Sequence, residues 1–249
     1  MNNTPETAIH TDVMIVGAGL SGIGSAVHLQ KNCPNRDYMI IERRDAIGGT
    51  WDLFKYPGIR SDSDMHTLGY NFKPWRAEKA IADGPAIWTY VNETADEYGI
   101  RDQIRFGHKL IASSWSTESA SWLLTVETGK GETQFSCNFL LMCAGYYNYD
   151  AGHQPEFQGR DDFQGTWVHP QFWPEDLDYT GKKVVVIGSG ATAMTLVPNM
   201  SQRAEKVTMV QRSPTYVVSR PSVDRVANFL RAIMPSSWAY GLVRLRNTL

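Results

Sequence analysis

The pattern of hydrophobic and polar positions gives the same order of predicted elements twice along the chain. Residues 12–16 form a largely apolar run, which is typical of a strand buried on both faces. A glycine-rich turn at residues 17–22 follows, then apolar positions at helical spacing, and then a second apolar run at residues 38–41. This order predicts a strand, a helix and a second strand that pairs in parallel with the first.

The second occurrence lies in the C-terminal third of the chain. Residues 183–187 form a β-branched run, residues 188–193 form a second glycine-rich turn, and residues 207–210 form the closing apolar run. Two such units predict an α/β fold that contains two Rossmann-like dinucleotide-binding units with parallel strands. A lone glycine pattern is weak evidence, but two patterns in the same strand–turn–helix–strand context are strong.

The residues that close the two units carry opposite charges. Glu42 follows the first unit and Arg212 follows the second, each about 20 residues after the glycine turn. A carboxylate at this place accepts hydrogen bonds from ribose hydroxyls, whereas a guanidinium favours a 2′-phosphate. The first unit therefore suits FAD or NAD and the second suits NADPH. An ordinary solvated arginine is the alternative interpretation of Arg212.

The glycine turns let the backbone approach a pyrophosphate, which then lies against the amide groups of a helix N-terminus. The alternative, that these glycines only serve tight turns, explains one pattern better than it explains two. The predicted nucleotide contacts of the first unit are Gly17, Gly19, Ser21, Gly22 and Glu42. Those of the second unit are Gly188, Ser189, Gly190, Ala191, Thr192, Ala193, Arg212 and Ser213.

Alternating positions between the two units predict an antiparallel β meander. Its runs cover residues 104–111, 121–127 and 133–139. The apolar residues 140–145 then predict a buried strand that leads into a turn.

Helices and a linker complete the predicted elements. A helix is expected from about Pro85, with Asp83 as its cap and Gly99 as its end. The composition at residues 146–181 shifts to glycine, proline and aromatic residues, which predicts a linker. Apolar positions at helical spacing after Ser213 predict an amphipathic helical tail.

Composition narrows the choice of partners. The chain has 249 residues, with 24 basic against 26 acidic side chains, so we expect no nucleic-acid partner and no attraction to anionic membranes. Cys33, Cys137 and Cys143 form no metal-ligand or CxxC spacing, which favours reduced, buried thiols and a cytoplasmic location. The polar N-terminus and the lack of a long apolar run predict neither a signal peptide nor a transmembrane segment, and no metal site is expected.

The linker holds the motif that identifies a family. Residues 163–174 follow the pattern FxGxxxHxxxWP, whose fixed positions here are Phe163, Gly165, His169, Trp173 and Pro174. The chain resembles the Baeyer–Villiger monooxygenases, which are class B flavoprotein monooxygenases, and in them this motif also lies between two glycine turns. Residues 49–54 and 56–64 look most like the ethionamide-activating subgroup.

The resemblance implies FAD and NADPH as cofactors, together with dioxygen and a small-molecule ketone or sulfide substrate. NADPH would reduce FAD, and oxygen would then be inserted beside a carbonyl group or transferred to sulfur. The additional cofactor contacts that it implies are Gly49, Thr50, Trp51, Arg60 and Asp62.

A catalytic role is implied for Asp62. In the resemblance it accepts a hydrogen bond from an arginine that stabilises developing negative charge, and that arginine is expected beyond Leu249. A turn or helix cap is the alternative role for Asp62. His169 has no acid or nucleophile at motif spacing, so a structural or gating role is expected for it.

The resemblance also implies a domain order. We expect an FAD-binding domain at residues 1–150, a linker at 151–180 and an NADPH-binding domain at 181–249. Because the flavin domain of the family resumes after its NADPH domain, we expect the sequence to be an N-terminal fragment or a truncated gene product, so the second unit is incomplete. The oligomeric state is left open.

Three other functions were weighed. A disulfide reductase needs a cysteine pair close behind the first glycine turn, and only Cys33 lies near it, so that function is rejected. A flavin monooxygenase that oxidises amines or sulfides is the enzymatic alternative. An inactive nucleotide-binding remnant is the non-enzymatic one.

Overall fold

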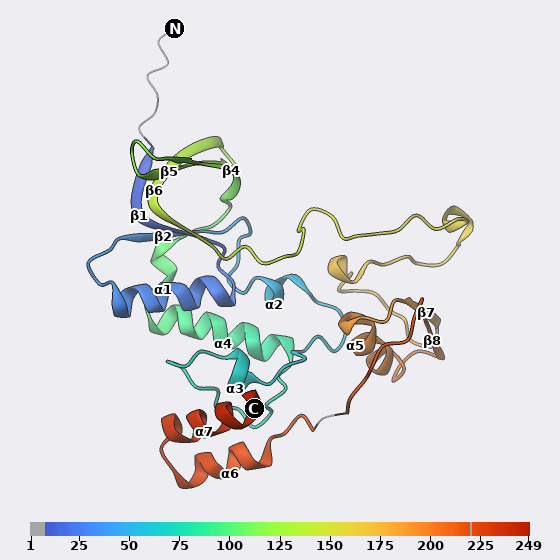
Figure 1. Cartoon of the computed structure of the whole chain (residues 1–249). Helices are drawn as coiled ribbons and strands as arrows, with labels where there is room; N and C mark the ends of the chain where they lie inside the picture. Colours follow the sequence, from blue (N-terminus) through green and yellow to red (C-terminus); the bar gives the residue numbers. More distant parts are fainter. Residues whose placement is uncertain (1–7, 220) are drawn as a thin grey trace. The chain divides into compact units, whose positions relative to one another are not determined.

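The computed structural model describes residues 8–219 and 221–249, so the expectation for the polar residues 1–7 lies outside this part. The chain divides into two compact units. One holds the described residues up to Leu53 together with Trp88–Tyr147, and the other holds Phe54–Ile87 and Asn148–Leu249. Figure 1 labels their helices and strands.

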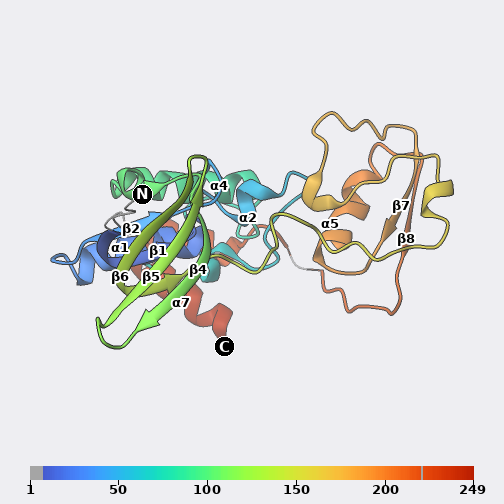
Figure 2. The same ribbon diagram turned by 90° about the horizontal axis from the view of Figure 1, so that it is seen from above.

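The first unit is built on a six-stranded sheet with the order β3-β2-β1-β6-β5-β4. The strands β3, β2, β1 and β6 pair in parallel, whereas β6, β5 and β4 pair in antiparallel fashion, side by side in Figure 2. The bounds are β1 (Ile9–Val16), β2 (Tyr38–Ile41), β3 (Ile104–Arg105), β4 (Lys109–Ser116), β5 (Ser121–Thr128) and β6 (Gly131–Met142).

The helices of the first unit include α1 (Leu20–Asn32) and the short α2 (Thr50–Leu53). The helix α4 (Gly84–Glu97) belongs to this unit from Trp88 onward, and a 3₁₀ turn, η1 (Arg101–Gln103), follows it. The core combines residues of the sheet with apolar faces of α1 and α4. Fully buried members include Met14, Ile23, Val91, Leu124 and Phe135.

The first βαβ unit is confirmed, and its register places the ends of β1 and β2 together. The strands pair from Val13 opposite Tyr38 to Val16 opposite Ile41. The glycine turn that follows β1 and the acid that follows β2 therefore lie at the same edge of the sheet, where ligands bind in open parallel sheets.

Two strand predictions need correction. The run at residues 104–111 is not one antiparallel strand, because a turn around Gly107 (φ +65°) separates β3, which pairs in parallel with β2, from β4. Residues 140–142 do not form a separate strand either, because β6 continues through them and pairs with β1.

Burial was also predicted wrongly at Met142, which is 57% exposed, and at Cys33, which is exposed.

The second unit contains a two-stranded parallel sheet, which confirms the second βαβ pattern. Long irregular segments connect its elements. The bounds are α3 (Met65–Leu68), η2 (Arg160–Asp162), η3 (Pro170–Phe172), β7 (Lys183–Ile187), α5 (Ala191–Met200), β8 (Lys206–Val210), α6 (Arg225–Ile233) and α7 (Ser236–Thr248).

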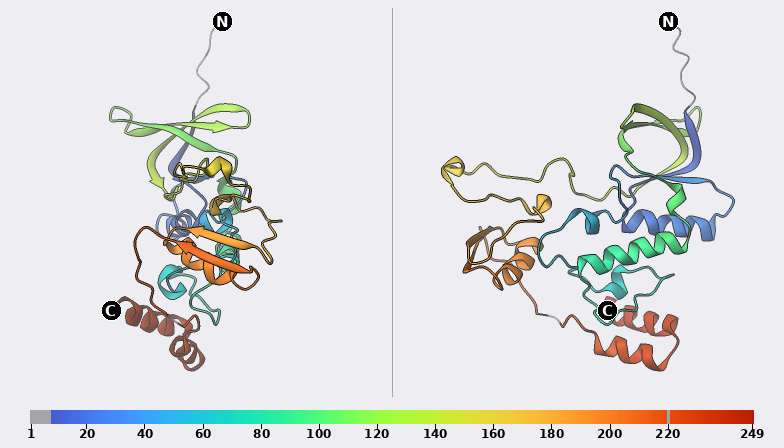
Figure 3. Two further views of the ribbon diagram at one scale, coloured as in Figure 1. Left: turned by 90° about the vertical axis from the view of Figure 1, so that its right-hand side faces the viewer. Right: turned by 180° about the vertical axis from the view of Figure 1, so that it is seen from behind.

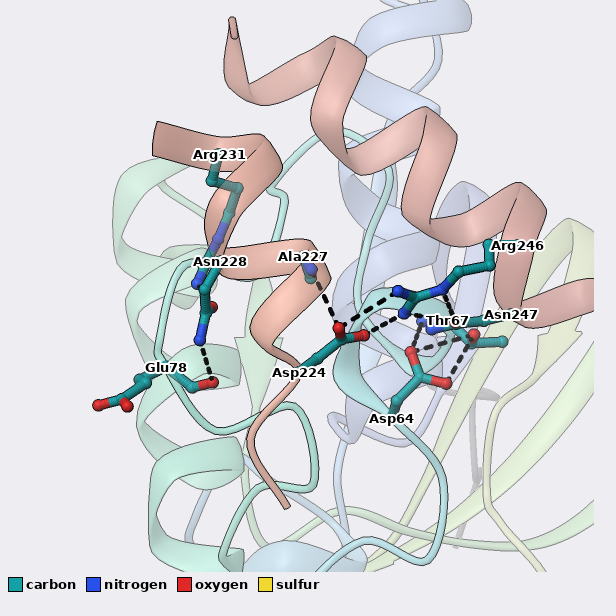
Figure 4. A network of polar contacts seen from close by, with 9 residues as sticks. All are labelled: Asp64, Thr67, Glu78, Asp224, Ala227, Asn228, Arg231, Arg246 and Asn247. Atoms are coloured by element: carbon teal, nitrogen blue, oxygen red, sulfur yellow. Dashed lines mark hydrogen bonds and ion pairs between the residues drawn. The ribbon is translucent and has the colours of Figure 1, made fainter. Parts of the chain in front are cut away.

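The helices α6 and α7 lie side by side in both views of Figure 3. They contact the segment around α3: the Tyr240 hydroxyl donates to the Gly69 carbonyl oxygen at 3.1 Å, and Arg231 donates to the Trp75 carbonyl oxygen at 3.2 Å. In Figure 4, Asp224 accepts hydrogen bonds from the Ala227 amide and from Arg246, which ties the start of α6 to α7. In the part of the chain that the structure describes, no helix is long and apolar enough to cross a membrane.

Candidate nucleotide sites

The first glycine loop is packed so closely that it excludes side chains. Gly17 has φ +108°, and a β-carbon on it would lie 2.5 Å from the Cys143 carbonyl oxygen. A β-carbon on Gly22, in the first turn of α1, would lie 1.8 Å from the Gly17 carbonyl oxygen. Both contacts are to backbone atoms, so the loop cannot keep this shape with any larger residue. The helix that follows begins at Gly19, which has no side chain to cap its N-terminal amide groups.

Glu42 is buried directly beside this loop, with 6% of its surface exposed. One carboxylate oxygen accepts a hydrogen bond from the Ala18 amide at 2.8 Å, and the other accepts one from the Arg44 amide at 2.9 Å. An ionised carboxylate offers about four acceptor positions, so about two remain for other donors. The acid predicted from spacing is therefore fixed at the loop by the fold itself.

The predicted contacts Gly49, Thr50 and Trp51 lie in the same unit as the first loop. A β-carbon on Gly19 would be 3.5 Å from the Gly49 Cα, and the Gly48 amide donates to the Ala18 carbonyl oxygen at 3.0 Å. Thr50 and Trp51 begin α2 directly after Gly49. The structure thus places Gly49 beside Gly19, and Thr50 and Trp51 follow it in the same compact unit.

Two charged residues at this site were missed from the sequence. Arg44 and Asp52 form an ion pair with a distance of 2.6 Å between Nη2 and Oδ2. The pair links the segment after β2 to α2. A base and an acid eight positions apart in an irregular loop give no periodic signal, which is why sequence reasoning did not join them.

Behind the first loop lies Cys143. Its amide donates to the Val16 carbonyl oxygen at 2.8 Å, and its sulfur lies 3.8 Å from the Ser25 hydroxyl oxygen. Burial raises the pKa of the Cys143 thiol above its ordinary value, and the hydrogen bond with Ser25 opposes this shift. The thiol is therefore neutral at pH 7 and serves in packing.

The second glycine loop has the same order of residues but an open surrounding. Gly188 has φ +132°, and Gly190 precedes α5 as its N-cap. Apart from the glycine itself and its two chain neighbours, no atom of the described residues lies within 4 Å of a β-carbon built on either glycine. Ser189 lies between them, and Ala191, Thr192 and Ala193 form the first turn of α5.

Arg212 and Ser213 follow β8 and are both exposed. The Ser189 hydroxyl donates to the Ser213 carbonyl oxygen at 3.5 Å, so this segment lies next to the second loop. Within residues 8–219 and 221–249, the Arg212 side chain makes no hydrogen bond or ion pair. The structure therefore places Arg212 in the segment next to the second glycine loop. Its guanidinium has no hydrogen-bond or ion-pair partner among the described residues.

Arg60 and Asp62 belong to the second compact unit, whereas the first glycine loop belongs to the first. Arg60 forms a backbone β-bridge with Asp83, and both Arg60 and Asp62 are exposed. The Asp62 carboxylate forms no hydrogen bond or ion pair to any residue that the structure describes. Asp64 caps α3 instead, because its side chain accepts from the Thr67 amide at 3.0 Å. The spacing of Asp64 and Thr67 is a capping signal that the sequence offered.

His169 has a local structural contact. Its Nδ1 accepts a hydrogen bond from the Gln171 amide at 3.2 Å and so caps η3. A β-carbon on Gly152 would lie 2.2 Å from the His169 ring, so the ring packs directly on that backbone. These contacts suit the structural role expected for this histidine.

Two family models match the chain. The model described as flavin-binding monooxygenase-like matches residues 80–235, and an NAD(P)-binding Rossmann-like domain matches residues 15–92. The FAD-containing monooxygenase EthA of Mycolicibacterium smegmatis is 58% identical over 93% of this chain and 47% of its own length. The chain thus spans about half the length of the curated relatives it matches.

Solved structures agree with these matches. An oxidised steroid monooxygenase bound to NADP has a TM-score of 0.78 and 30% identity, and the match covers 94% of this chain and 44% of that one. A cyclohexanone monooxygenase from Rhodococcus sp. Phi1, bound to NADP⁺, has a TM-score of 0.73 and 27% identity over 85% of this chain and 40% of that one. With the first family model covering more than half of its residues, this chain belongs to the flavin-binding monooxygenase-like family.

Proposed function

We propose that this chain binds FAD at the first glycine loop and NADPH at the second, and acts in an NADPH- and dioxygen-dependent monooxygenase reaction. One observation carries the proposal: two equivalent strand–loop–helix units end in a buried carboxylate, Glu42, and in an exposed guanidinium, Arg212. The names of the relatives support the assignment, because one is an FAD-containing monooxygenase and another is a monooxygenase bound to NADP.

The first loop fits the ADP part of FAD. Glu42 keeps about two acceptor positions for ribose hydroxyls after its bonds to Ala18 and Arg44. The start of α1 supplies amide groups and the positive end of a helix dipole for the pyrophosphate. Gly17, Gly19, Ser21 and Gly22 are the proposed contacts, together with Gly49, Thr50 and Trp51.

The second loop fits NADPH. Arg212 and Ser213 lie beside Ser189, and a guanidinium binds a phosphate with two parallel hydrogen bonds. Gly188, Gly190 and the first turn of α5, Ala191 to Ala193, would face the pyrophosphate. The open space around both glycines leaves room for a ligand at the backbone.

FAD, when bound, supplies the acceptance of hydride and the activation of dioxygen, while the protein binds, orients and shields the reactants. The substrate class that we propose is a ketone, oxygenated beside its carbonyl group, or a sulfide. The name of a cyclohexanone monooxygenase among the structural neighbours supports a ketone. A cytoplasmic location and the domain bounds 1–150, 151–180 and 181–249 remain predictions from the sequence.

The test of the nucleotide assignment is Arg212→Ala. Because a hydrogen bond to a charged group contributes about 1.5–3 kcal/mol, NADPH affinity should fall roughly 10- to 100-fold, while NADH affinity should stay nearly constant. Isothermal titration with both nucleotides measures this difference. Lys206→Ala, at the exposed start of β8, is the control that removes a positive charge from the strand that precedes Arg212. Equal losses for NADPH and NADH would contradict the proposed role of Arg212.

Asp62 is proposed to accept a hydrogen bond from a catalytic arginine supplied outside this sequence, and Arg60 to lie at the cofactor. The supporting observation is that Asp64, and not Asp62, makes the helix cap, so the Asp62 carboxylate is available. In a preparation that oxygenates a ketone, Asp62→Ala should preserve NADPH oxidation but lower oxygenation roughly 100- to 1000-fold, with hydrogen peroxide as the product. The measurement is the ratio of oxygenated product to NADPH consumed. A wild-type ratio in Asp62→Ala would contradict the catalytic role of Asp62 and leave it as a turn residue.

A further inference from the structure

The first glycine loop and the segment Gly48–Leu53 are held together by a closed ring of contacts. Glu42 accepts hydrogen bonds from the amides of Ala18 and Arg44, and the carbonyl oxygen of Ala18 accepts one from the Gly48 amide at 3.0 Å. Both polar groups of the Ala18 backbone are therefore used to join three chain segments. In this part of the ring, the amide of Gly48 is the group that joins the Gly48–Leu53 segment to the glycine loop.

The ion pair between Arg44 and Asp52 closes the ring. The side chains are 27% and 14% exposed, so solvent screens them less than it screens a surface pair. The Asp52 amide also donates to the Gly49 carbonyl oxygen at 3.1 Å, which fixes the acid to the double-glycine turn. The guanidinium of Arg44 thus holds α2, and its own amide is held by Glu42.

We propose that Arg44 and Asp52 are positioning residues, whose ion pair holds the Gly48–Leu53 segment on the first glycine loop so that a nucleotide meets Glu42 and Gly49 as one preassembled surface. The proposal deepens the FAD site and rests on it. Without the ion pair, the hydrogen bond from Gly48 to Ala18 would still join the segment to the loop, but the segment would be less ordered, and ordering it on binding would lower the affinity for the ligand.

The central variant is Asp52→Asn, which keeps the shape of the side chain and removes its charge. Asp52→Glu keeps the charge and is the conservative variant expected to restore function. Asp45→Asn is the matched control, because Asp45 is an exposed acid next to Arg44 in the same segment. Circular dichroism verifies that each variant folds.

Two measurements test the proposal. In the chain without nucleotide, hydrogen exchange of the Gly48 amide should become about tenfold faster in Asp52→Asn and stay unchanged in Asp45→Asn, while amides in β1 and β5 keep their rates. FAD affinity, measured by titration with excess NADP⁺ present, should fall about tenfold in Asp52→Asn. Affinity for ADP, which lacks the flavin half, should fall less than affinity for FAD. Asp52→Glu should keep the wild-type exchange rate at the Gly48 amide and the wild-type affinity for FAD.

The outcomes separate this inference from the FAD proposal. Unchanged exchange at Gly48 in Asp52→Asn, or an equal acceleration in Asp45→Asn, would show that the pair does not hold the segment. Faster exchange with unchanged FAD affinity would overturn the positioning role for the nucleotide. A wild-type chain that binds neither FAD nor ADP would refute the proposed first site, and with it the nucleotide part, while the exchange rates still decide whether the ion pair holds the loop.

Discussion

The two glycine loops share one sequence pattern, but the protein uses the glycines in different ways. In the first loop, β-carbons on Gly17 and Gly22 would lie 2.5 Å and 1.8 Å from backbone oxygens of the protein itself. In the second loop, no described residue other than the glycine's own chain neighbours lies within 4 Å of β-carbons on Gly188 and Gly190. The fold therefore requires the first pattern even without a ligand, whereas in the second loop the described residues require glycine only through the backbone conformation at Gly188, with φ +132°.

The charged residues that follow the second strand of each unit, Glu42 and Arg212, also differ in how far they contact the protein itself. Glu42 is buried and bonded to two backbone amides, so it supports the fold. Arg212 is exposed, and its side chain makes no hydrogen bond or ion pair with the described residues. Two positions that look equivalent in the sequence should therefore respond differently to mutation.

The largest expected effect is on folding of the first loop. Gly22→Ala forces a methyl group against a backbone oxygen that cannot move aside, so the free energy of unfolding should fall by about 3 kcal/mol. Gly190→Ala, its counterpart in an open surrounding and at φ −78°, should change it by less than about 0.5 kcal/mol. Urea unfolding of both variants measures the difference, and equal losses would remove the distinction between the loops.

A smaller effect is expected from the charged residues. Glu42→Gln leaves one acceptor oxygen for two amide donors, so the free energy of unfolding should fall by about 1.5–3 kcal/mol. Arg212→Ala should leave it within about 0.5 kcal/mol of the wild-type value. The same urea experiment compares them. An unchanged free energy of unfolding in Glu42→Gln would mean that Glu42, like Arg212, does not support the fold.

The smallest effect is a pH dependence located in the second unit. Burial lowers the pKa of His66, which is 2% exposed; Asp64 and Asp224 oppose this shift, and Arg231 and Arg246 add to it. Stability from the neutral ring is complete above the ordinary histidine pKa and is lost as pH falls below it, by at most about 1.4 kcal/mol per pH unit. His66→Gln should flatten the decline in unfolding free energy between pH 7 and 5 relative to the wild type. An identical decline in the variant would assign the pH dependence to other groups.

The sequence predicted the parts of the fold that depend on local patterns. The apolar runs and glycine turns located β1, α1, β2, β7, α5 and β8, and the spacing located Glu42 and Arg212. These features are readable because strand burial, helical periodicity and positive φ angles leave residue types at fixed intervals.

The missed features depend on contacts between distant or irregular segments. Nothing in residues 104–111 shows that Ile104 pairs with Ile40 in parallel while Lys109 pairs with Glu127 in antiparallel fashion. The ion pair of Arg44 and Asp52 likewise arises from the path of a loop.

The strand β6 has a consequence for how this chain tolerates changes in length during evolution. The strand pairs with β5 through Gly131–Cys137 and with β1 through Phe135–Met142, and the backbone of Cys143, directly after the strand, packs against the first glycine loop. One residue inserted near Leu140 would turn the following side chains to the opposite face of the sheet and displace Cys143, whose backbone packs against that loop. An insertion at Gly129 or Lys130 would be absorbed by the exposed hairpin turn. Length variation among homologues should therefore gather at the turn and be absent from the strand.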